Sequence, residues 1–435
     1  MSIQILDLRG RTVTPDLVKS VVPRAALDIG AAVSQVAPVV EAVRTEGVAA
    51  INRVSAQFDG FIADPIWATA AEFEQALATL EPNLKAAIEE AASRVRATSV
   101  SSMPTENKTS FATGAAVTTR YQPIESVGLY VPGGKAVYPS SVVMNVVPAQ
   151  VAGVAQIVIA TPGQKALNGR PHPTVLAASA ILGVDRVLVI GGPAAIAAMA
   201  YGVSSIGLDP VDLITGPGNI FVAAAKRIVR GQVAIDSEAG TTEVLVLADE
   251  TANARAVALD LISQAEHDEA AASVLVTDSK VLANNVFNEI ESLVSTMSNE
   301  QRIRVALSGQ QSALVIVESL TAAIDFANSY ATEHLEIMTG DDQAVLSRIK
   351  HAGAIFVGEF SPVALGDYMA GSNHVLPTGG TARFNAGLGV HTFLRSQQVI
   401  DYSQTALATI AAKIDTFARA EGLDAHGRAI TDRLG

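Results

Sequence analysis

The sequence contains no cysteine, and this absence excludes several kinds of chemistry at once. Disulfide bonds, thiolate zinc sites and cysteine nucleophiles are all ruled out. Positive charge is also in deficit, because 30 Lys and Arg face 43 Asp and Glu, which gives a formal charge of -13. Nucleic acids are bound by clusters of basic residues, and the basic residues here are scattered. We therefore expect no nucleic-acid partner.

Targeting and membrane-spanning segments are missing as well. Residues 1–13 lack the basic region and apolar core of a secretory signal. A long uncharged stretch, residues 140–163, is interrupted by Asn145, Pro148, Gln150 and Gln156. It predicts a buried helix followed by a strand rather than a membrane span. We expect a cytoplasmic protein without membrane association.

Apolar, β-branched runs that alternate with helical segments indicate an α/β fold. Hydrophobic residues make up 49% of the 435 residues, which is enough for two or three domain cores. Alternating strands and helices are typical of parallel sheets, and two sheet blocks are predicted, at about 130–240 and 243–380. The region before residue 125 and the tail from about 401 are predicted to be helical. The expected strands are residues 127–131, 156–160, 186–192, 243–249, 273–277, 313–317 and 354–358.

Two glycine turns follow expected strands. Gly133 and Gly134 form one, and Gly216 and Gly218 form the other, just before a helix. Such turns let backbone N–H groups approach a phosphate, but neither completes a G-x-G-x-x-G fingerprint, so ordinary tight connections remain an alternative. Asn219 is either a helix cap or a ligand contact.

Three histidine-containing segments are candidates for a metal or catalytic site. In ISQAEHDEA (262–270), Gln264 and His267 have the spacing of one helix face, although the segment taken alone favours an exposed polar surface over a metal site. Glu333 and His334 combine a carboxylate with a base that titrates near neutrality, as proton transfer requires, but chance Glu-His neighbours are equally common. H-E-x-x-H is absent, so the usual helical metallopeptidase site has no support.

A glycine-rich polar loop, residues 366–390, carries Asp367 and His374. It follows the expected strand 354–358, so we expect it at the carboxyl end of a sheet, where open α/β folds place their sites. His426 lies near the C-terminus and by itself predicts nothing.

In sequence order, six segments together resemble the histidinol dehydrogenase family, and the likeness runs from about residue 23 to the tail. Members of that family oxidise L-histidinol to L-histidine in two NAD-linked steps through an aldehyde, at the end of histidine biosynthesis. The segments are VGLYVPGGKAVYPSSVVMNVVPAQVAGV (127–154), GPGNIFVAAAKR (216–227), DSEAGTTEVLVLAD (236–249), ISQAEHD (262–268), EHLEI (333–337) and GDYMAGSNHVLPTGGTARF (366–384).

The resemblance implies one zinc ion per subunit and a homodimer with shared active sites. His334 would take the alcohol proton, and Glu333 would activate water for the second oxidation. The implied zinc ligands are Gln264, His267, Asp367 and, from the neighbouring subunit, His426. The implied substrate contacts are Thr242, Gln264, His267, His334, Asp367, His374, Glu421 and His426, with Glu421 also from the neighbour. The implied NAD contacts are Tyr130, Asn219 and the position of Ala194.

Three positions depart from the family pattern. Thr241 and Thr242 replace a Pro-Ser pair, so a hydroxyl is kept before Glu243. Ala194 stands where a glutamine that contacts NAD is expected, which removes a hydrogen bond worth about 1 kcal/mol. Thr332 replaces a proline, and we expect this to alter only loop stiffness.

The resemblance also implies an intertwined dimer of chains with two incomplete Rossmann-like parallel-sheet domains. We assign residues 1–22 to an N-terminal arm, 23–129 with 243–385 to the first domain and its helical flank, 130–242 to the second domain, and 386–435 to a helical tail that contributes to the partner's site. Two alternatives remain: a related metal-dependent NAD dehydrogenase acting on another small polar alcohol, and a scaffold protein with the family fold. The retention of His374, Glu421 and His426 favours histidinol.

Overall fold

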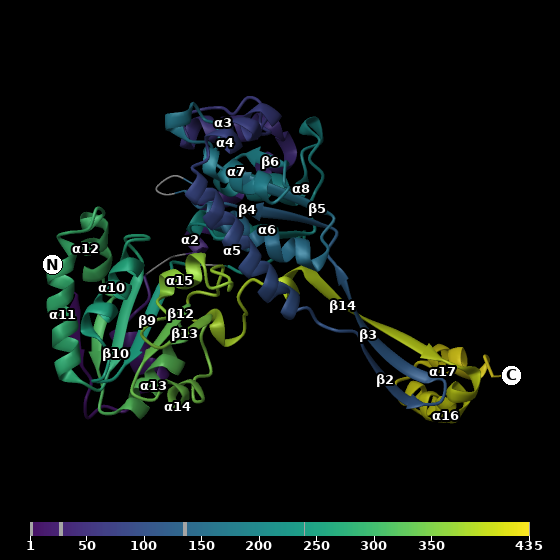
Figure 1. Ribbon diagram of the computed structural model, residues 1–435. Coiled ribbons are helices and arrows are strands. Elements are labelled where there is room, and N and C mark those ends of the chain that lie inside the picture. Colours follow the sequence, from purple (N-terminus) through teal and green to yellow (C-terminus); the bar gives the residue numbers. More distant parts are fainter. Residues whose placement is uncertain (1–2, 26–28, 134–136, 239, 435) are drawn as a thin grey trace.

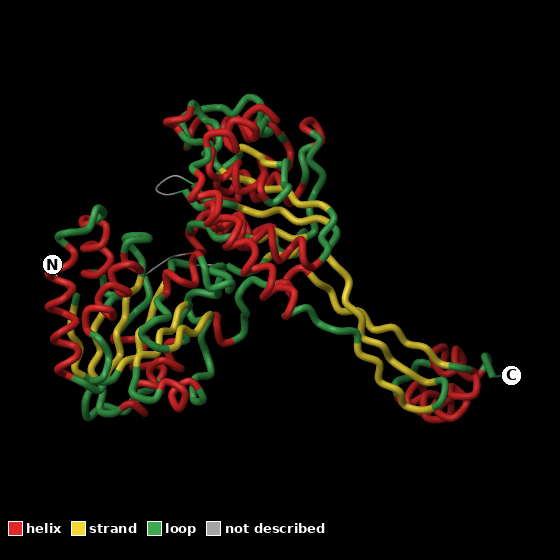
Figure 2. The backbone as a smooth tube through the Cα atoms, in the orientation of Figure 1, coloured by secondary structure: helices red, strands yellow, loops and turns green. Residues whose placement is uncertain are grey.

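The computed structural model describes residues 3–25, 29–133, 137–238 and 240–434. These residues form two helix-covered parallel sheets and an antiparallel ribbon that projects away from both (Figures 1 and 2). The predicted α/β class is confirmed. Within the described residues, no helix is both long and apolar enough to cross a membrane.

The larger sheet has six parallel strands in the order β1-β11-β10-β9-β12-β13. Helices pack on both of its faces, which explains why the inner strands β9, β10 and β11 are largely apolar and buried along their whole length. The strands are β1 (Gln4–Asp7), β9 (Glu243–Ala248), β10 (Ala272–Thr277), β11 (Ala313–Ile316), β12 (His334–Met338) and β13 (Ala354–Val357). The helices are α1 (Pro15–Val21), α10 (Ala254–Ala265), α11 (Lys280–Val294), α12 (Glu300–Ser308), α13 (Leu320–Tyr330), α14 (Asp342–Leu346) and α15 (Val363–Tyr368).

The smaller sheet has five parallel strands in the order β6-β5-β4-β7-β8. Its first strand, β4, lies in the middle, so the topological switch point lies between β4 and β7. The strands are β4 (Ser126–Tyr130), β5 (Gln156–Thr161), β6 (Val187–Val189), β7 (Leu213–Thr215) and β8 (Ala234–Ile235). The surrounding helices are α2 (Ile29–Glu46), α3 (Val48–Phe58), α4 (Ala70–Thr79), α5 (Pro82–Ser101), α6 (Pro139–Ala152), α7 (Pro173–Ile181), α8 (Gly192–Tyr201) and α9 (Ile220–Val229), with short 3-10 turns at η1 (Lys165–Leu167) and η2 (Ser204–Ile206).

The packing differs from the predicted division of the chain at both ends of the first block. The described part of the expected N-terminal arm belongs to the six-stranded sheet, because β1 pairs with β11 and α1 packs on α13. The helical flank α2 to α5 packs on the five-stranded sheet instead, where α2 contacts α8 and α9, and α5 contacts α6. Amphipathic periodicity identifies the buried face of a helix but does not identify the sheet that covers it.

The projecting arm is an antiparallel ribbon that ends in two helices (Figure 1). Its strands, in the order β14-β3-β2, are β14 (Leu394–Tyr402), β3 (Ala115–Pro123) and β2 (Asn107–Ala112). The tip consists of α16 (Gln404–Ala420) and α17 (Asp424–Thr431), with the predicted break at Gly422 between them. The predicted helical tail is thus helical only beyond residue 403, because residues 394–402 pair with β3. Two further 3-10 turns, η3 (Thr381–Arg383) and η4 (Val390–Phe393), precede β14.

Candidate active site

The predicted catalytic residues lie at the amino edge of the six-stranded sheet. Glu333 directly precedes β12, His334 is its first residue, and Thr242 directly precedes β9. The expectation of a site at the carboxyl end of this sheet is therefore wrong. The loop after β13 does start at the carboxyl end, but α15 carries the chain back, so that Pro377 lies near the backbone of Glu333 and Gly353.

A hydrogen-bonded chain joins Gln264, Thr242 and Glu333. The Gln264 amide nitrogen donates to the Thr242 hydroxyl at 2.7 Å, and this hydroxyl donates to Glu333 Oε2 at 2.7 Å. The Gln264 side chain is buried, and its Oε1 has no hydrogen-bond partner among the described residues. An unpartnered buried amide oxygen is costly, so this atom is suited to bind an external group.

Glu333 and His334 are both buried, and burial shifts their protonation in opposite directions. The Glu333 carboxylate also accepts the Glu243 N–H at 2.9 Å, yet burial raises the pKa of Glu333 well above its ordinary value. Burial lowers the pKa of His334 to about 4, although the nearby Asp367 charge acts in the opposite sense. His334 Nδ1 lies 3.2 Å from the Glu243 carbonyl oxygen, to which it donates. The ring is therefore neutral near pH 7, with Nε2 free to accept a proton.

His267 and Asp367 approach each other from different elements. His267 lies just beyond the end of α10, not on the helix face expected from the spacing, and Asp367 lies on α15. His267 Nδ1 donates to the Ser263 carbonyl at 3.0 Å, and the other ring nitrogen, Nε2, lies 3.9 Å from Asp367 Oδ2. Imidazoles that ligate metals are commonly held through the other ring nitrogen in this way.

His374 connects the two sheet domains. Its Nδ1 donates to the Asp367 carbonyl at 3.2 Å, and its Nε2 lies 3.1 Å from the hydroxyl of Ser141, near the start of α6. Helix α6 follows β4 and therefore begins at the carboxyl edge of the five-stranded sheet. The amino edge of one sheet thus meets the carboxyl edge of the other at the predicted substrate residue. Ser141 was not predicted, and no motif in the sequence singles it out.

His426 and Glu421 are exposed at the tip of the arm, on α17 and at the end of α16. The other predicted ligands lie on or next to α10 and α15, in the part of the chain from which the arm projects (Figure 1). One chain therefore brings together three of the four predicted zinc ligands. Over the described ranges no cluster of three His, Cys, Asp or Glu side chains is poised for a metal, and the set here includes an amide. The donor types nevertheless fit zinc, because His267 Nε2 and Asp367 Oδ2 lie 3.9 Å apart and Gln264, at the end of α10, offers an amide oxygen without a partner.

The predicted NAD residues lie at the carboxyl edge of the five-stranded sheet. The Tyr130 hydroxyl accepts the Gly192 N–H at 3.0 Å, and burial raises the pKa of Tyr130 to about 12. Asn219 caps α9 by accepting the N–H groups of Phe221 and Val222. Ala194 is buried in the core and offers only a methyl group, so its side chain has no hydrogen bond to give a cofactor.

The glycine turns at this edge pack closely against the rest of the chain. A Cβ on Gly216 would lie 2.1 Å from the Tyr130 carbonyl oxygen, and a Cβ on Gly191 would lie 2.8 Å from Pro162 Cβ. Contacts within the chain thus exclude a side chain at both positions, as in ordinary tight turns. Gly134 lies outside the described residues.

Two pairs of buried charged residues near the site were not predicted. Arg24 binds Glu243 at 2.8 Å and lies over the Tyr330 ring. Glu336 is fully buried on β12 beside Asp260 of α10, and burial raises the pKa of both carboxyl groups. Glu336 could have been found in the sequence, because it is a charged residue between apolar neighbours, two residues after His334.

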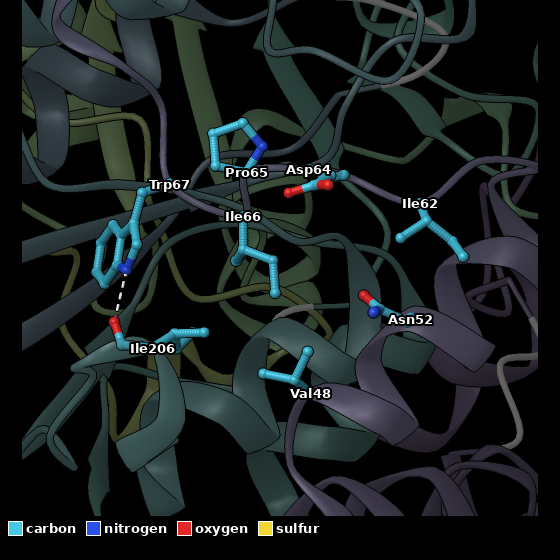
Figure 3. A pocket seen from close by; sticks show the side chains of 9 residues that line it. Val48, Asn52, Ile62, Asp64, Pro65, Ile66, Trp67 and Ile206 are labelled. Atoms are coloured by element: carbon cyan, nitrogen blue, oxygen red, sulfur yellow. Dashed lines mark hydrogen bonds between the residues drawn. The ribbon is translucent and has the colours of Figure 1, made fainter.

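A surface hollow of about 420 Å³ between α3, residues 62–67 and Ile206 contains none of the predicted site residues (Figure 3). Trp67 forms one wall and donates its indole N–H to the Ile206 carbonyl at 2.8 Å. The hollow is therefore separate from the candidate active site.

Comparison with known proteins identifies the family. The model of the family described as histidinol dehydrogenase matches residues 22–434. Histidinol dehydrogenase of Leifsonia xyli subsp. xyli is 53% identical over 431 residues, with 99% of each chain covered. That of Corynebacterium glutamicum is 52% identical over 432 residues, with 99% of this chain and 98% of the relative covered. The crystal structure of histidinol dehydrogenase from Elizabethkingia anophelis superposes with a TM-score of 0.92 at 32% identity, covering 99% of this chain and 98% of that one. The chain belongs to the histidinol dehydrogenase family and is an oxidoreductase.

Proposed function

We propose that this chain oxidises L-histidinol to L-histidine in two hydride transfers to NAD, with a zinc ion in the site. The observation that carries the proposal is the approach of His267 Nε2 to the Asp367 carboxylate at 3.9 Å, together with the unpartnered Gln264 Oε1, whose amide Thr242 links to Glu333. Metal ligands and proton-transfer groups thus occupy one edge of one sheet.

Zinc would be held by Gln264, His267, Asp367 and a fourth residue from a second chain. When bound, it supplies Lewis-acid polarisation and a fixed grip on nitrogen and oxygen donors of the substrate. The chain's own contribution is orientation. The Thr242 hydroxyl binds the Gln264 amide nitrogen, and the Ser263 carbonyl binds His267 Nδ1, so that the opposite atom of each side chain is left for a ligand.

His334 serves the first oxidation as the general base. The Glu243 carbonyl holds its Nδ1 proton, so Nε2 is the atom that accepts the hydroxyl proton of the alcohol as a hydride leaves the carbinol carbon. Burial keeps the ring neutral before the proton arrives, because it lowers the pKa of His334. The product of this step is the aldehyde.

Glu333 serves the second oxidation. Its raised pKa makes the carboxylate a stronger base than a carboxylate in water, so it accepts a proton from a water molecule that adds to the aldehyde. A second hydride then leaves the hydrated carbon. Thr242 and the Glu243 N–H hold Glu333 Oε2, which fixes the orientation of the carboxyl group.

A homodimer in which each arm completes the partner's site accounts for His426 and Glu421. Both residues lie on the arm, which extends away from the two parallel sheets of the same chain (Figure 1). The arm also exposes large apolar side chains, with Ile400 70% and Phe417 73% exposed. Such residues are typical of a surface that a second chain covers.

A stoichiometric assay tests the function. The purified protein receives L-histidinol, NAD and zinc, and NADH is counted per histidine formed. We expect two NADH per histidine and loss of activity with a chelator. Turnover of another small polar alcohol with none of histidinol would overturn the proposal.

Mixing of inactive variants tests the shared site. Hybrid dimers of His426→Ala and His334→Ala chains contain one intact site, so we expect partial recovery of activity. A mixture of His426→Ala and Glu421→Ala is the matched control, because both of its hybrid sites receive a damaged arm. Failure of the first mixture to recover, with subunit exchange verified by mass, would contradict the shared site.

A further inference from the structure

Asp59, the residue that ends α3, places a carboxylate beside the glycine turn that follows β6. Its Oδ2 lies 3.8 Å from the position that a Cβ on Gly191 would occupy. Its negative charge also raises the pKa of the Tyr130 hydroxyl, and this hydroxyl accepts the Gly192 N–H. Asp59 therefore lies at the same carboxyl edge of the five-stranded sheet as the predicted NAD contacts.

This carboxylate has no partner within the chain as described. It forms no hydrogen bond and no ion pair with any residue of the described ranges, although it is half-buried. Burial alone raises the pKa of Asp59, so no nearby cation offsets its charge. A carboxylate withdrawn from water without compensation lowers the stability of the fold unless it binds something else.

The topology supplies a reason for the position. In a parallel sheet of this strand order, a carboxylate at the end of the second strand binds the ribose hydroxyls of the adenosine half of a dinucleotide. Here the second strand, β5, ends at Thr161 and is followed by Pro162 and Gly163, so the strand itself supplies no carboxylate. Gly191 approaches Pro162 so closely that a Cβ would lie 2.8 Å from its ring, and Asp59 reaches the same turn from α3.

We propose that Asp59 accepts the hydroxyl groups of the adenosine ribose of NAD and selects NAD over NADP. The inference rests on the proposed use of a nicotinamide dinucleotide. A free 2′-hydroxyl donates to the carboxylate, whereas the 2′-phosphate of NADP places like charge against it. Asp59 is thus a specificity-determining residue that takes no part in proton transfer.

Binding to the zinc-loaded full-length protein, without histidinol, tests the inference. Dissociation constants for NADH and NADPH are measured by quenching of protein fluorescence and by calorimetry. We expect NADH to bind at least about 100-fold more tightly than NADPH to the native protein. Asp59→Asn should weaken NADH binding about 10-fold, as loss of a charged hydrogen bond predicts, and strengthen NADPH binding. A gain for NADPH cannot arise from misfolding.

Asp185→Asn is the matched control, because Asp185 is exposed next to the amino end of the same strand, β6. It should leave both constants unchanged. An unchanged ratio of the two constants in Asp59→Asn, with tight NADH binding by the native protein, would overturn the role of Asp59 and leave the proposed function standing. Failure of the native protein to bind either dinucleotide would overturn the proposed function, and this inference with it.

Discussion

The Thr242 hydroxyl accepts the amide N–H of Gln264 and donates to Glu333, each at 2.7 Å. One hydroxyl thus orients a candidate metal ligand and a candidate base together. It fixes the amide so that Oε1, rather than the nitrogen, remains without a partner. Thr242, which we expect to contact substrate, thus also holds two of its neighbours in place.

Replacing Thr242 therefore tests the orientation of the Gln264 amide. Thr242→Val keeps the shape but leaves a buried N–H without an acceptor, a cost of about 1–3 kcal/mol. We expect zinc affinity to fall by roughly 5-fold or more, measured by competition with a chromogenic chelator. Thr242→Ser keeps the hydroxyl and should keep the affinity. Equal affinities for the native protein and the valine variant would contradict the role.

The buried imidazole of His334 should make the metal-free protein sensitive to mild acid. Its pKa falls from 6.5 to about 4 on folding. Between these two values the unfolded chain binds a proton at this imidazole and the folded chain does not. Stability is therefore full above pH 6.5 and declines as the pH falls toward 4, by about 3 kcal/mol. His334→Asn should lack this part of the decline. Urea unfolding of both proteins in a chelator between pH 4 and 7 checks it, and identical pH dependence would refute it.

The buried ion pair of Lys226 and Asp236 should hold the glycine turn at the switch point. Lys226 Nζ binds Asp236 Oδ1 and the Gly216 carbonyl, each at 2.6 Å, and Asp236 Oδ2 accepts the Gly216 N–H. Lys226→Met leaves the buried carboxylate of Asp236 without a cation, so we expect a loss of about 3–5 kcal/mol in the free energy of unfolding.

An exposed ion pair provides the comparison for Lys226. Arg94 and Glu90 are both 54% exposed, so Arg94→Met should cost less than about 1 kcal/mol. Chemical denaturation measures both variants. Similar losses for the two substitutions would show that the buried pair has no special role.

The carboxyl pair of Glu336 and Asp260 should make the protein less stable in alkali. Burial raises the pKa of both groups, that of Asp260 to about 6, so the folded chain retains protons that the unfolded chain releases. The contribution of this pair to stability is therefore greatest in acid and is lost as the pH rises through the folded pKa values. Glu336→Gln cannot ionise, so its stability relative to the native protein should increase from pH 5 to pH 8. Thermal unfolding across this range measures the difference, which a constant offset would contradict.

Local sequence signals identified seven of the fourteen strands in the described residues, all of them in the two parallel sheets. The apolar runs predicted as strands correspond to β4, β5, β6, β9, β10, β11 and β13. β12 was not predicted, because it contains His334 and Glu336 and directly follows Glu333. Charged and polar residues at these positions do not indicate a buried strand. The strand β14 was also missed, since its nine mostly exposed residues form a strand only by pairing with β3.

The sequence by itself determined the α/β class, the family and the residue types available for chemistry, because these depend on local periodicity and on motifs within short segments. Only the tertiary structure decided that the flank α2 to α5 covers the second sheet, and that Glu333 and His334 lie at an amino edge. It also brought Asp59 to Gly191 and Thr242 to Gln264. These contacts join residues distant in the chain, and which apolar faces meet depends on the packing of the whole core rather than on any local pattern.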